Sequence, residues 1–577
     1  MSFSLDRRSF VAACTAAGLP LDLSHQLWAT DRAVDGNGSR RADPVTKEQI
    51  AAAEAVLGLS FRDSDRDLML RSVNQALATY TRLHAIPLSN AVPPAFHFDP
   101  VPLGKSVVPQ PATRAARPVA HATAIKAPQT EADWAFASVT DLGKLIRARK
   151  VTSRQLVERS LARIDRYNSE LLAVITPTPE RALAQADALD AEARAGKFRG
   201  PLHGIPYGAK DLYAVPKYPT TWGSPLYKDQ VLDVTAAVVE RLDAAGAVLV
   251  AKTSLGEFAQ DDVWFGGQTK NPWNTTVGSS GSSAGSASGV SAGLYPFALG
   301  TETLGSIVAP STRCGVSGLR PTYGRVSRYG AMALSWTMDK AGPIARSAAD
   351  LALVFAALHG ADPRDPSTRT VHFAFEPARP LAGIRIGVLD SMTRASNRPN
   401  SAATVANNQK VLDALVKQGA KLVTVTWPVD PSANTMQFLL DVEAGAAFDA
   451  ITRDNEVDKM VLQTANAWPT TFRAAHLISA VDYVQANRAR TLLISRLDEF
   501  FRDVDVVVAP GTGGNTLAAT NLSGHPQACV PVSVSDTGTW QSVSFIAALY
   551  REDLALRLAH AWQMASDAHT KRPPKFS

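Results

Sequence analysis

The sequence predicts an α/β protein whose central parallel or mixed β-sheet is covered by helices on both faces. Helical and strand patterns alternate from about residue 132 onward. One helix–glycine–strand unit occurs twice, over residues 235–251 with Gly246 as the helix stop and over residues 405–426 with Gly419 in that role. Further apolar strands are expected at 384–389, 504–509 and 528–534. We therefore expect one large domain over residues 131–577.

A small helical extension is predicted before this domain, over residues 31–86. Thr46 and Gln49 have the spacing of a capping box, and Gly58 can end the helix that follows them. A second helix is expected from about Ser64 until Pro87 stops it. Residues 87–130 are rich in proline and small residues without periodicity, which is typical of an extended linker or strap. In the large domain, Ser138 and the pair Thr152 and Gln155 are expected to cap two further helices.

Composition excludes several classes of function. The 577 residues are 45% apolar and 19% charged, which is ordinary for a globular protein. The formal charge of +6 is small for this length and no long basic run occurs, so no nucleic-acid partner is expected. The 11 histidines form no HExxH pattern and the three cysteines form no CxxC pair, so neither a zinc site nor a disulfide framework is indicated. Cys314 and Cys529 are expected to be small buried fillers.

The first thirty residues resemble a targeting segment. Arg7 and Arg8 precede an uncharged stretch that ends at Leu19, an arrangement similar to a twin-arginine export signal. Residues 1–30 are therefore expected to direct the protein to the periplasm or outside the cell, with a cytoplasmic protein as the alternative. The stretch is too short for a membrane span, which needs about 20 residues, and no transmembrane segment is predicted.

A serine- and glycine-rich stretch at residues 277–293 carries the chemistry. Composition alone favours a flexible linker, but the stretch lies between Asn271-Pro-Trp-Asn274 and an apolar run at 294–299, inside the α/β region. Small residues in such a place let the backbone approach another backbone or a ligand closely.

Four motifs in order resemble the amidase signature family. The segment from Asn271 to Ser286 is similar to the serine-rich signature of that family, and Gly300-Thr-Glu-Thr-Leu-Gly-Ser306-Ile is similar to its GTDTGGSI segment. Residues 314–327 match the segment that follows, and Gly204-Ile-Pro-Tyr-Gly-Ala-Lys210-Asp211 is similar to GIPxxxKD. The resemblance covers residues from about 132 to the end of the sequence. It implies an amidohydrolase that cuts carbon–nitrogen amide bonds of a small-molecule substrate, without metal or organic cofactor.

The resemblance implies a catalytic triad. Ser306 corresponds to the nucleophile, Ser282 to a bridging serine on a cis peptide bond, and Lys210 to the base. A serine hydroxyl attacks well only when a nearby base removes its proton, and a lysine is a base only in its neutral form. The Lys210 side chain is therefore expected to be buried. Ser282 would relay the proton from Ser306 to Lys210 and later deliver one to the departing amine.

The resemblance also assigns the oxyanion hole, to the backbone N–H groups of Thr303, Leu304, Gly305 and Ser306. Three positions depart from the family pattern. Glu302 replaces an aspartate, which lengthens the carboxylate stem, and Leu304 replaces a glycine and is expected to reshape the acyl side of the pocket. Leu304 can still offer its N–H if its φ is negative. Val308 replaces an arginine, which favours a neutral or apolar acyl group.

Pocket walls and two other residues complete these expectations. Residues 330–380 and 430–480 are the expected source of the pocket walls. His203 is interpreted as structural because the mechanism implied by the resemblance uses no histidine. Asn521 begins a segment similar to the NLxGxP turn of the family, which either lines the pocket or is a plain turn.

Three alternative functions stay open from the sequence. Residues 281–285 fit the G-x-S-x-G elbow of α/β-hydrolases, which would make Ser283 the nucleophile of an esterase; the strand that should end at this serine is not predicted, because residues 275–281 are polar and rich in glycine. The A subunit of a tRNA-dependent amidotransferase shares the triad but works with partner subunits. A catalytically inactive binding protein is the third alternative.

Overall fold

The computed structural model describes residues 44–84, 89–92, 98–102, 104–105, 127–395, 401–429 and 436–577. The predicted export signal, Cys14 and most of the predicted linker lie outside these residues. The chain divides into two units, residues 1–87 and residues 88–577.

Within residues 44–84, the described part of the first unit, the chain forms the helices α3 (Lys47–Leu57) and α4 (Asp63–His84). The predicted capping box is confirmed, because Thr46 Oγ1 accepts from the Gln49 N–H and the Gln49 side chain accepts from the Thr46 N–H. Gly58 ends α3 in the left-handed conformation with φ of 65°. Arg66 of α4 binds the carboxylate of Glu54 in α3 at 2.9 Å, which ties the two helices together.

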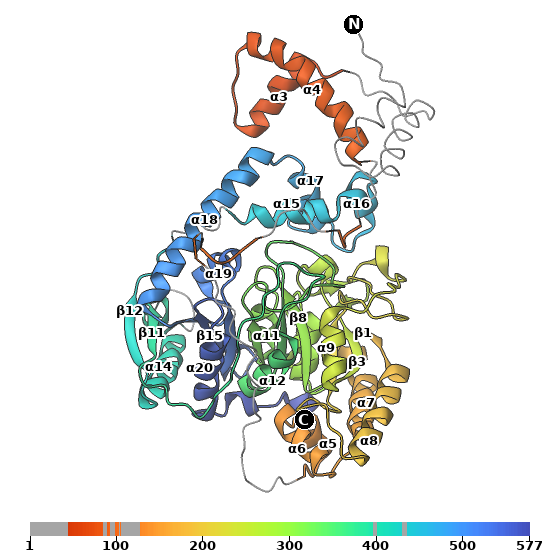
Figure 1. Ribbon diagram of the computed structural model, residues 1–577, viewed down its shortest axis with the longest axis vertical. Coiled ribbons are helices and arrows are strands. Elements are labelled where there is room, and N and C mark those ends of the chain that lie inside the picture. Colours follow the sequence, from red (N-terminus) through yellow and green to blue (C-terminus); the bar gives the residue numbers. More distant parts are fainter. Residues whose placement is uncertain are drawn as a thin grey trace. The chain divides into compact units, whose positions relative to one another are not determined.

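The second unit is built on a mixed sheet, as the sequence predicts, and the described residues contribute 11 strands to it (Figure 1). In spatial order the strands are β1 (Val174–Pro177), β3 (Val248–Thr253), β2 (Pro206–Lys210), β8 (Phe297–Glu302), β10 (Lys340–Ala345), β9 (Ser317–Arg320), β14 (Gln527–Val534), β15 (Trp540–Ala547), β13 (Val506–Pro510), β11 (Arg385–Leu389) and β12 (Lys421–Val425). Strands β3, β2 and β8 run parallel to one another, and so do β13, β11 and β12. The strands between these two groups pair antiparallel. Two small hairpin-like sheets lie apart from it, β4 (Val263–Trp264) with β5 (Gly267–Gln268) and β6 (Lys270–Asn271) with β7 (Asn274–Gly278).

Helices cover the sheet on both faces. In the described part of this unit, the helices longer than five residues are α6 (Val139–Arg147), α7 (Ser153–Leu171), α8 (Pro179–Arg194), α9 (Ala237–Ala245), α10 (Ala284–Ser291), α11 (Val308–Cys314), α12 (Ala348–Leu358), α14 (Ser401–Lys417), α15 (Phe438–Ala447), α17 (Trp468–Ala475), α18 (Ala480–Asp503), α19 (Leu517–Ser523) and α20 (Glu552–Met564). The shorter helices are α5 (Glu131–Ala135), α13 (Asp390–Thr393) and α16 (Asp449–Arg453). The predicted caps are confirmed, with Ser138 before α6 and the Thr152–Gln155 capping box at α7.

Alternate residues of the central strands enter two separate hydrophobic clusters. Leu249 of β3 belongs to the larger cluster, with side chains of α9, α12 and α20, whereas Val248 and Val250 belong to the smaller one, with side chains of α7, α8 and α10. This alternation is the period-two geometry of a strand buried on both faces. At the other end of the sheet the larger cluster reaches both faces, because the consecutive β13 residues Val506, Val507 and Val508 all belong to it.

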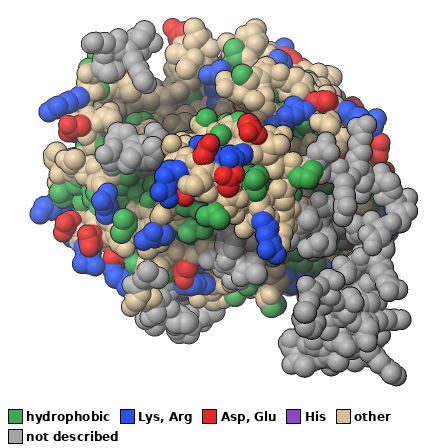
Figure 2. All heavy atoms as spheres, turned by 90° about the horizontal axis from the view of Figure 1, so that it is seen from above, with side chains coloured by type: hydrophobic (Ala, Val, Ile, Leu, Met, Phe, Trp, Pro, Cys, Tyr) green, Lys and Arg blue, Asp and Glu red, His purple; other side chains and the backbone are tan. Residues whose placement is uncertain are grey.

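The surface agrees with a chain of small net charge. On the face seen in Figure 2, the described basic and acidic side chains are interspersed and do not gather into a patch of one sign. None of the helices described here is long and apolar enough to cross a membrane.

Candidate active site

The predicted residues meet at the carboxyl ends of two parallel strands. Lys210 is the last residue of β2, and Thr301 and Glu302 end its neighbour β8. Ser282 lies just before α10, and Ser306 lies in the turn between β8 and α11. Crevices outside the carboxyl ends of strands are where α/β sheets bind ligands. The topology therefore collects four separate sequence motifs at one edge.

Lys210 is fully buried and binds hydroxyl groups. Its Nζ donates to Ser282 Oγ at 2.8 Å, to Thr301 Oγ1 at 2.9 Å and to Ser283 Oγ at 3.2 Å. Burial lowers the pKa of Lys210 to about 7, although the carboxylates of Asp339 and Glu302 act in the opposite direction. The expected burial is confirmed, and a substantial fraction of this amine is neutral near pH 7.

The neighbouring carboxylate of Asp211 does not hold Lys210 in its charged form. Asp211 pairs with the buried Lys252, whose Nζ lies 2.7 Å from Oδ1, and its other oxygen accepts from the N–H and hydroxyl of Thr221. Within the described part of the chain, Lys210 takes part in no ion pair. A second lysine on the adjacent strand β3 thus neutralises the acid that follows Lys210.

The two serines before α10 have different surroundings from Ser306. The Gly281–Ser282 peptide bond is cis, as the resemblance implies. The Ser283 N–H donates to the carbonyl of Ser306 at 3.1 Å, which joins the two serine segments. Among the described residues, the Ser306 hydroxyl has no hydrogen-bond partner, and the residue is half-buried. Ser306 is therefore the accessible hydroxyl beside this buried network.

Glu302 anchors the turn that carries Ser306. Its carboxylate accepts from the N–H groups of Ile307 at 2.9 Å and Val308 at 3.0 Å. The same carboxylate is bound by Arg320 at 2.7 Å and Asn521 at 3.0 Å, and all of these side chains are buried. Burial raises the pKa of Glu302, but the charge and hydrogen bond of Arg320 outweigh it and hold the pKa below its ordinary value.

The turn between Glu302 and Ile307 leaves four backbone N–H groups available. Within the described part of the chain, those of Thr303, Leu304, Gly305 and Ser306 bind no acceptor. Leu304 is not among the residues with positive φ, so its N–H can still serve in place of that of the glycine in the family pattern. The next residue, Gly305, has φ of 95°. The side chain of Leu304 packs against the larger hydrophobic cluster, and its effect on the acyl side of the pocket stays a prediction.

Replacing Arg320 by methionine is expected to reduce the unfolding free energy by about 3–5 kcal/mol, because it leaves the Glu302 carboxylate buried and unpaired. Thermal or chemical unfolding measures this loss. The double variant Arg320→Met with Glu302→Gln should regain most of it, since no uncompensated charge remains. A double variant as unstable as the single one would show that the stem of Arg320, and not its charge, carries the effect.

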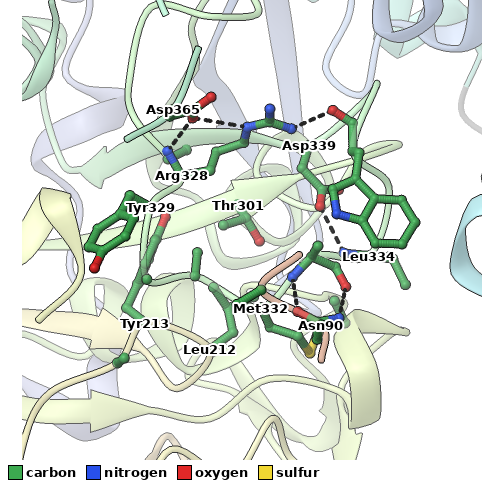
Figure 3. A pocket seen from close by; sticks show the side chains of 18 of the residues that line it. Asn90, Leu212, Tyr213, Thr301, Arg328, Tyr329, Met332, Leu334, Asp339 and Asp365 are labelled. Carbon is green, nitrogen blue, oxygen red and sulfur yellow. Dashed lines mark hydrogen bonds and ion pairs between the residues drawn. The ribbon is translucent and has the colours of Figure 1, made fainter. Parts of the chain in front are cut away.

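A cavity of about 360 Å³ opens beside this turn (Figure 3). It meets the network at Thr301 and Thr303, and its walls include Leu212, Tyr213, Tyr329, Met332 and Trp336. The prediction that residues 330–380 supply walls is confirmed by two segments, 330–341 and 364–367. Residues 436–480 supply none of the lining, whereas residues 89–91 and 212–234 do. The sequence analysis did not predict residues 89–91 or 212–234 as walls. Nothing in a proline-rich segment or in a turn after β2 marks a pocket wall in the sequence.

Five other residues named from the sequence have structural roles. His203 is buried, with Nε2 3.1 Å from the carbonyl of Leu189, so its structural interpretation is confirmed. Asn521 does not line the cavity; it binds Glu302, which gives its segment a third role that was not predicted. Cys314 and Cys529 are buried free thiols, as expected. Val308 is buried at the start of α11 and supplies only its N–H to Glu302.

The G-x-S-x-G interpretation of Ser283 needs one correction. A strand does precede it, β7 (Asn274–Gly278), where none was predicted, because main-chain pairing with β6 forms a strand from polar residues. That strand belongs to a two-stranded sheet and ends five residues before the serine, so it is no nucleophile elbow. Ser283 Oγ is also buried and engaged, donating to the carbonyl of Thr301 and accepting from its N–H.

Comparisons with known proteins agree with this site. A sequence model of the amidase family matches residues 155–553. The chain is 32% identical over 500 residues to the A subunit of the glutamyl-tRNA(Gln) amidotransferase of Rhodopirellula baltica, covering 76% of this chain and 98% of that one. It is 32% identical over 469 residues to a putative amidase, AmiD, of Mycobacterium tuberculosis, covering 76% and 95%.

The solved structure of native peptide amidase from Stenotrophomonas maltophilia matches with a TM-score of 0.66 at 30% identity, covering 76% of this chain and 99% of that one. An amidase family protein of Bacillus anthracis matches with a TM-score of 0.68 at 27% identity, covering 77% and 93%. The family match spans more than half of the chain and includes all four motifs that meet at the site. The chain therefore belongs to the amidase (amidase signature) family and is an amidohydrolase.

Proposed function

We propose that this enzyme hydrolyses the carbon–nitrogen bond of an amide through an acyl-enzyme on Ser306. The observation that carries the proposal is the buried Lys210 amine, which has no ion-pair partner among the described residues and donates to Ser282 Oγ. Neutral Lys210 accepts a proton from Ser282 while Ser282 accepts one from Ser306, so the Ser306 oxygen attacks the amide carbon.

The turn that holds Ser306 supplies the electrostatic part of the reaction. The free N–H groups of Thr303, Leu304, Gly305 and Ser306 form the oxyanion hole and donate to the oxygen that gains charge in the tetrahedral intermediate. Their positions are held because Glu302 binds the N–H groups of the next two residues. Ser282 then gives its proton to the departing amine and takes one back from Lys210. Water attacks the acyl-enzyme and passes a proton through Ser282 to Lys210, and the same relay returns that proton to the Ser306 oxygen as the acid leaves.

The A subunit of a tRNA-dependent amidotransferase is the second candidate function. It is favoured by the similarity to the protein of Rhodopirellula baltica, 98% of whose length is covered. In that role the same site would release ammonia from glutamine for a partner subunit. Copurification with partner subunits would support it, whereas turnover of simple amides by the isolated chain supports the amidase.

A fluorophosphonate probe tests the proposed nucleophile, because it forms a stable bond to an activated serine. Wild-type protein is expected to bind about one probe per chain, and peptide mass spectrometry should locate the adduct on Ser306. Heat-unfolded protein is the control and should stay unlabelled. An adduct on Ser283 would favour the esterase alternative, and an unlabelled folded protein would favour the inactive binding protein.

A further inference from the structure

Asn90 makes a two-way hydrogen bond with the backbone of the cavity wall. Its Nδ2 donates to the carbonyl of Ala333 at 2.8 Å, and its Oδ1 accepts from the N–H of the same residue at 2.7 Å. A side-chain amide carries one donor group and one acceptor in a plane, so it pairs with both main-chain groups of Ala333 as a neighbouring strand would. Figure 3 shows both bonds joining Asn90 to this wall.

The segment that carries Asn90 is a wall of the cavity. Ser89, Asn90 and Ala91 all line it, and a turn closed by the bond from the Val92 N–H to the Ser89 carbonyl gives the segment its shape. These residues precede the part of the chain that matches the amidase family, residues 155–553. The wall is thus supplied by residues outside the part of the chain that matches the family.

The bond of Asn90 also connects to the turn that carries Ser306. Leu334 follows Ala333, and its N–H donates to Asp339 Oδ2 at 2.8 Å. The other oxygen of Asp339 accepts from the hydroxyl of Thr303 at 2.6 Å. Asn90 therefore fixes one end of a loop whose other end holds the first residue of the proposed oxyanion hole.

The charged side chains that line the cavity are bound within the protein. Arg328 donates to Asp365, to the carbonyl of Trp336 and to the hydroxyl of Tyr323. The Asp339 carboxylate accepts from Thr303, Leu334 and Ser335, and Lys340 donates to the Met338 carbonyl. Arg364 pairs with Glu240 and Asp362. A charged ligand would have to displace these partners, so the cavity favours an uncharged one.

We infer that Asn90 is a specificity-determining residue, which holds the segment Ser89–Val92 as a wall so that the cavity encloses an uncharged apolar group of the amide substrate. This inference rests on the proposed function. A cavity of about 360 Å³ equals about twelve times the roughly 30 Å³ that one water occupies in the liquid, enough for a phenylalkyl group. Asn90 contacts none of the three proposed catalytic residues, and Asp339 keeps its own bonds to Thr303, Leu334 and Ser335 when Asn90 is replaced. The oxyanion hole therefore stays in place, and the change acts on substrate affinity.

Steady-state kinetics with four amides tests this. Acetamide is the small reference, 4-phenylbutanamide places the phenylalkyl group on the acyl side, N-(3-phenylpropyl)acetamide places it on the amine side, and succinamate adds a charge. Wild-type enzyme is expected to prefer one phenylalkyl amide over acetamide and over succinamate. Asn90→Ala should raise KM for that preferred amide about tenfold, with kcat and the kinetics of acetamide unchanged.

Two variants control the experiment. Val92→Ala alters an exposed side chain of the same segment that does not line the cavity and should leave KM unchanged. Asn90→Gln keeps both amide groups and should restore part of the affinity. An equal rise in KM for acetamide and for the phenylalkyl amides, an unchanged KM for both, or a preference for succinamate would overturn the inference.

A binding measurement separates this inference from the proposed function. In the Ser306→Ala background, 4-phenylbutanamide and N-(3-phenylpropyl)acetamide should change the tryptophan fluorescence of the protein, because Trp222 and Trp336 line the cavity. Asn90→Ala should weaken that binding about tenfold. If Asn90→Ala binds both amides as tightly as its parent does, the inferred role of Asn90 is overturned whatever the catalytic result. If Asn90→Ala weakens binding but the wild-type enzyme hydrolyses no amide, only the proposed function is overturned.

Discussion

Alanine in place of Ser306 is expected to lower kcat/KM for amide hydrolysis by about 10⁵-fold or more, because no other hydroxyl can form the acyl-enzyme. The chain offers a matched control in the same hydrogen-bond network. Ser283→Ala removes a hydroxyl that is already bound to both main-chain groups of Thr301 and should cost only about tenfold. Initial rates with a neutral amide measure both variants.

The folded state of both serine variants must be checked by thermal unfolding. Ser306 is half-buried with a hydroxyl that binds none of the described residues, so its alanine variant should unfold close to the wild-type temperature. Ser283 is fully buried and engaged, so its variant is expected to lose some stability. Loss of activity only in Ser283→Ala would make Ser283 the nucleophile and overturn the proposed triad.

Replacing Lys210 by methionine is expected to lower kcat by about 10³- to 10⁴-fold, because it removes the base but keeps the length of an apolar stem. Lys197→Met is the control, since that lysine is exposed and should tolerate the change. Retention of more than a tenth of the wild-type kcat by Lys210→Met would show that another group takes the proton.

The same lysine predicts a dependence on pH. Burial lowers the pKa of Lys210 to about 7, and only the neutral amine can act as the base. Below this pKa, kcat/KM of the wild-type enzyme should fall about tenfold for each unit of pH, and above it kcat/KM should become constant. Lys210→Arg should show no activity at either end, because a guanidinium stays protonated. A wild-type profile that is flat from pH 5 to 9 would contradict the assignment.

Local signals in the sequence were sufficient for the helices with a clear cap or stop and for five of the apolar strands. Caps at Thr46, Ser138 and Thr152 and the stop at Gly246 rest on contacts within a few residues, which the order of residues specifies directly. The strand expected at 247–251 extends two residues further, as β3 (Val248–Thr253), because pairing on both sides and not apolar character ends a strand. Strands β1, β2 and β8 of the sheet were not predicted, and neither were the three strands β9, β10 and β15.

Those three strands show why pairing escapes sequence patterns. Strand β10 contains Gly342 and Pro343, residues that disfavour a strand by themselves, and it exists because β8 and β9 pair with it on both sides. The order of the 11 strands likewise depends on contacts between residues far apart in the chain, for which no local signal exists.

For the site, the order of residues was enough to single out Lys210, Ser282 and Ser306 as the candidate catalytic residues. Their motifs are short and contiguous, so residue type and spacing identify them. Three other features became visible only in the folded chain. Lys252 forms an ion pair with Asp211, Arg320 and Asn521 bind the Glu302 carboxylate, and Asn90 holds a wall of the cavity. Each of these pairs joins separate segments, and the physical reason is the same: burial of one polar group requires a partner, and only the fold determines which distant side chain is near enough to supply it.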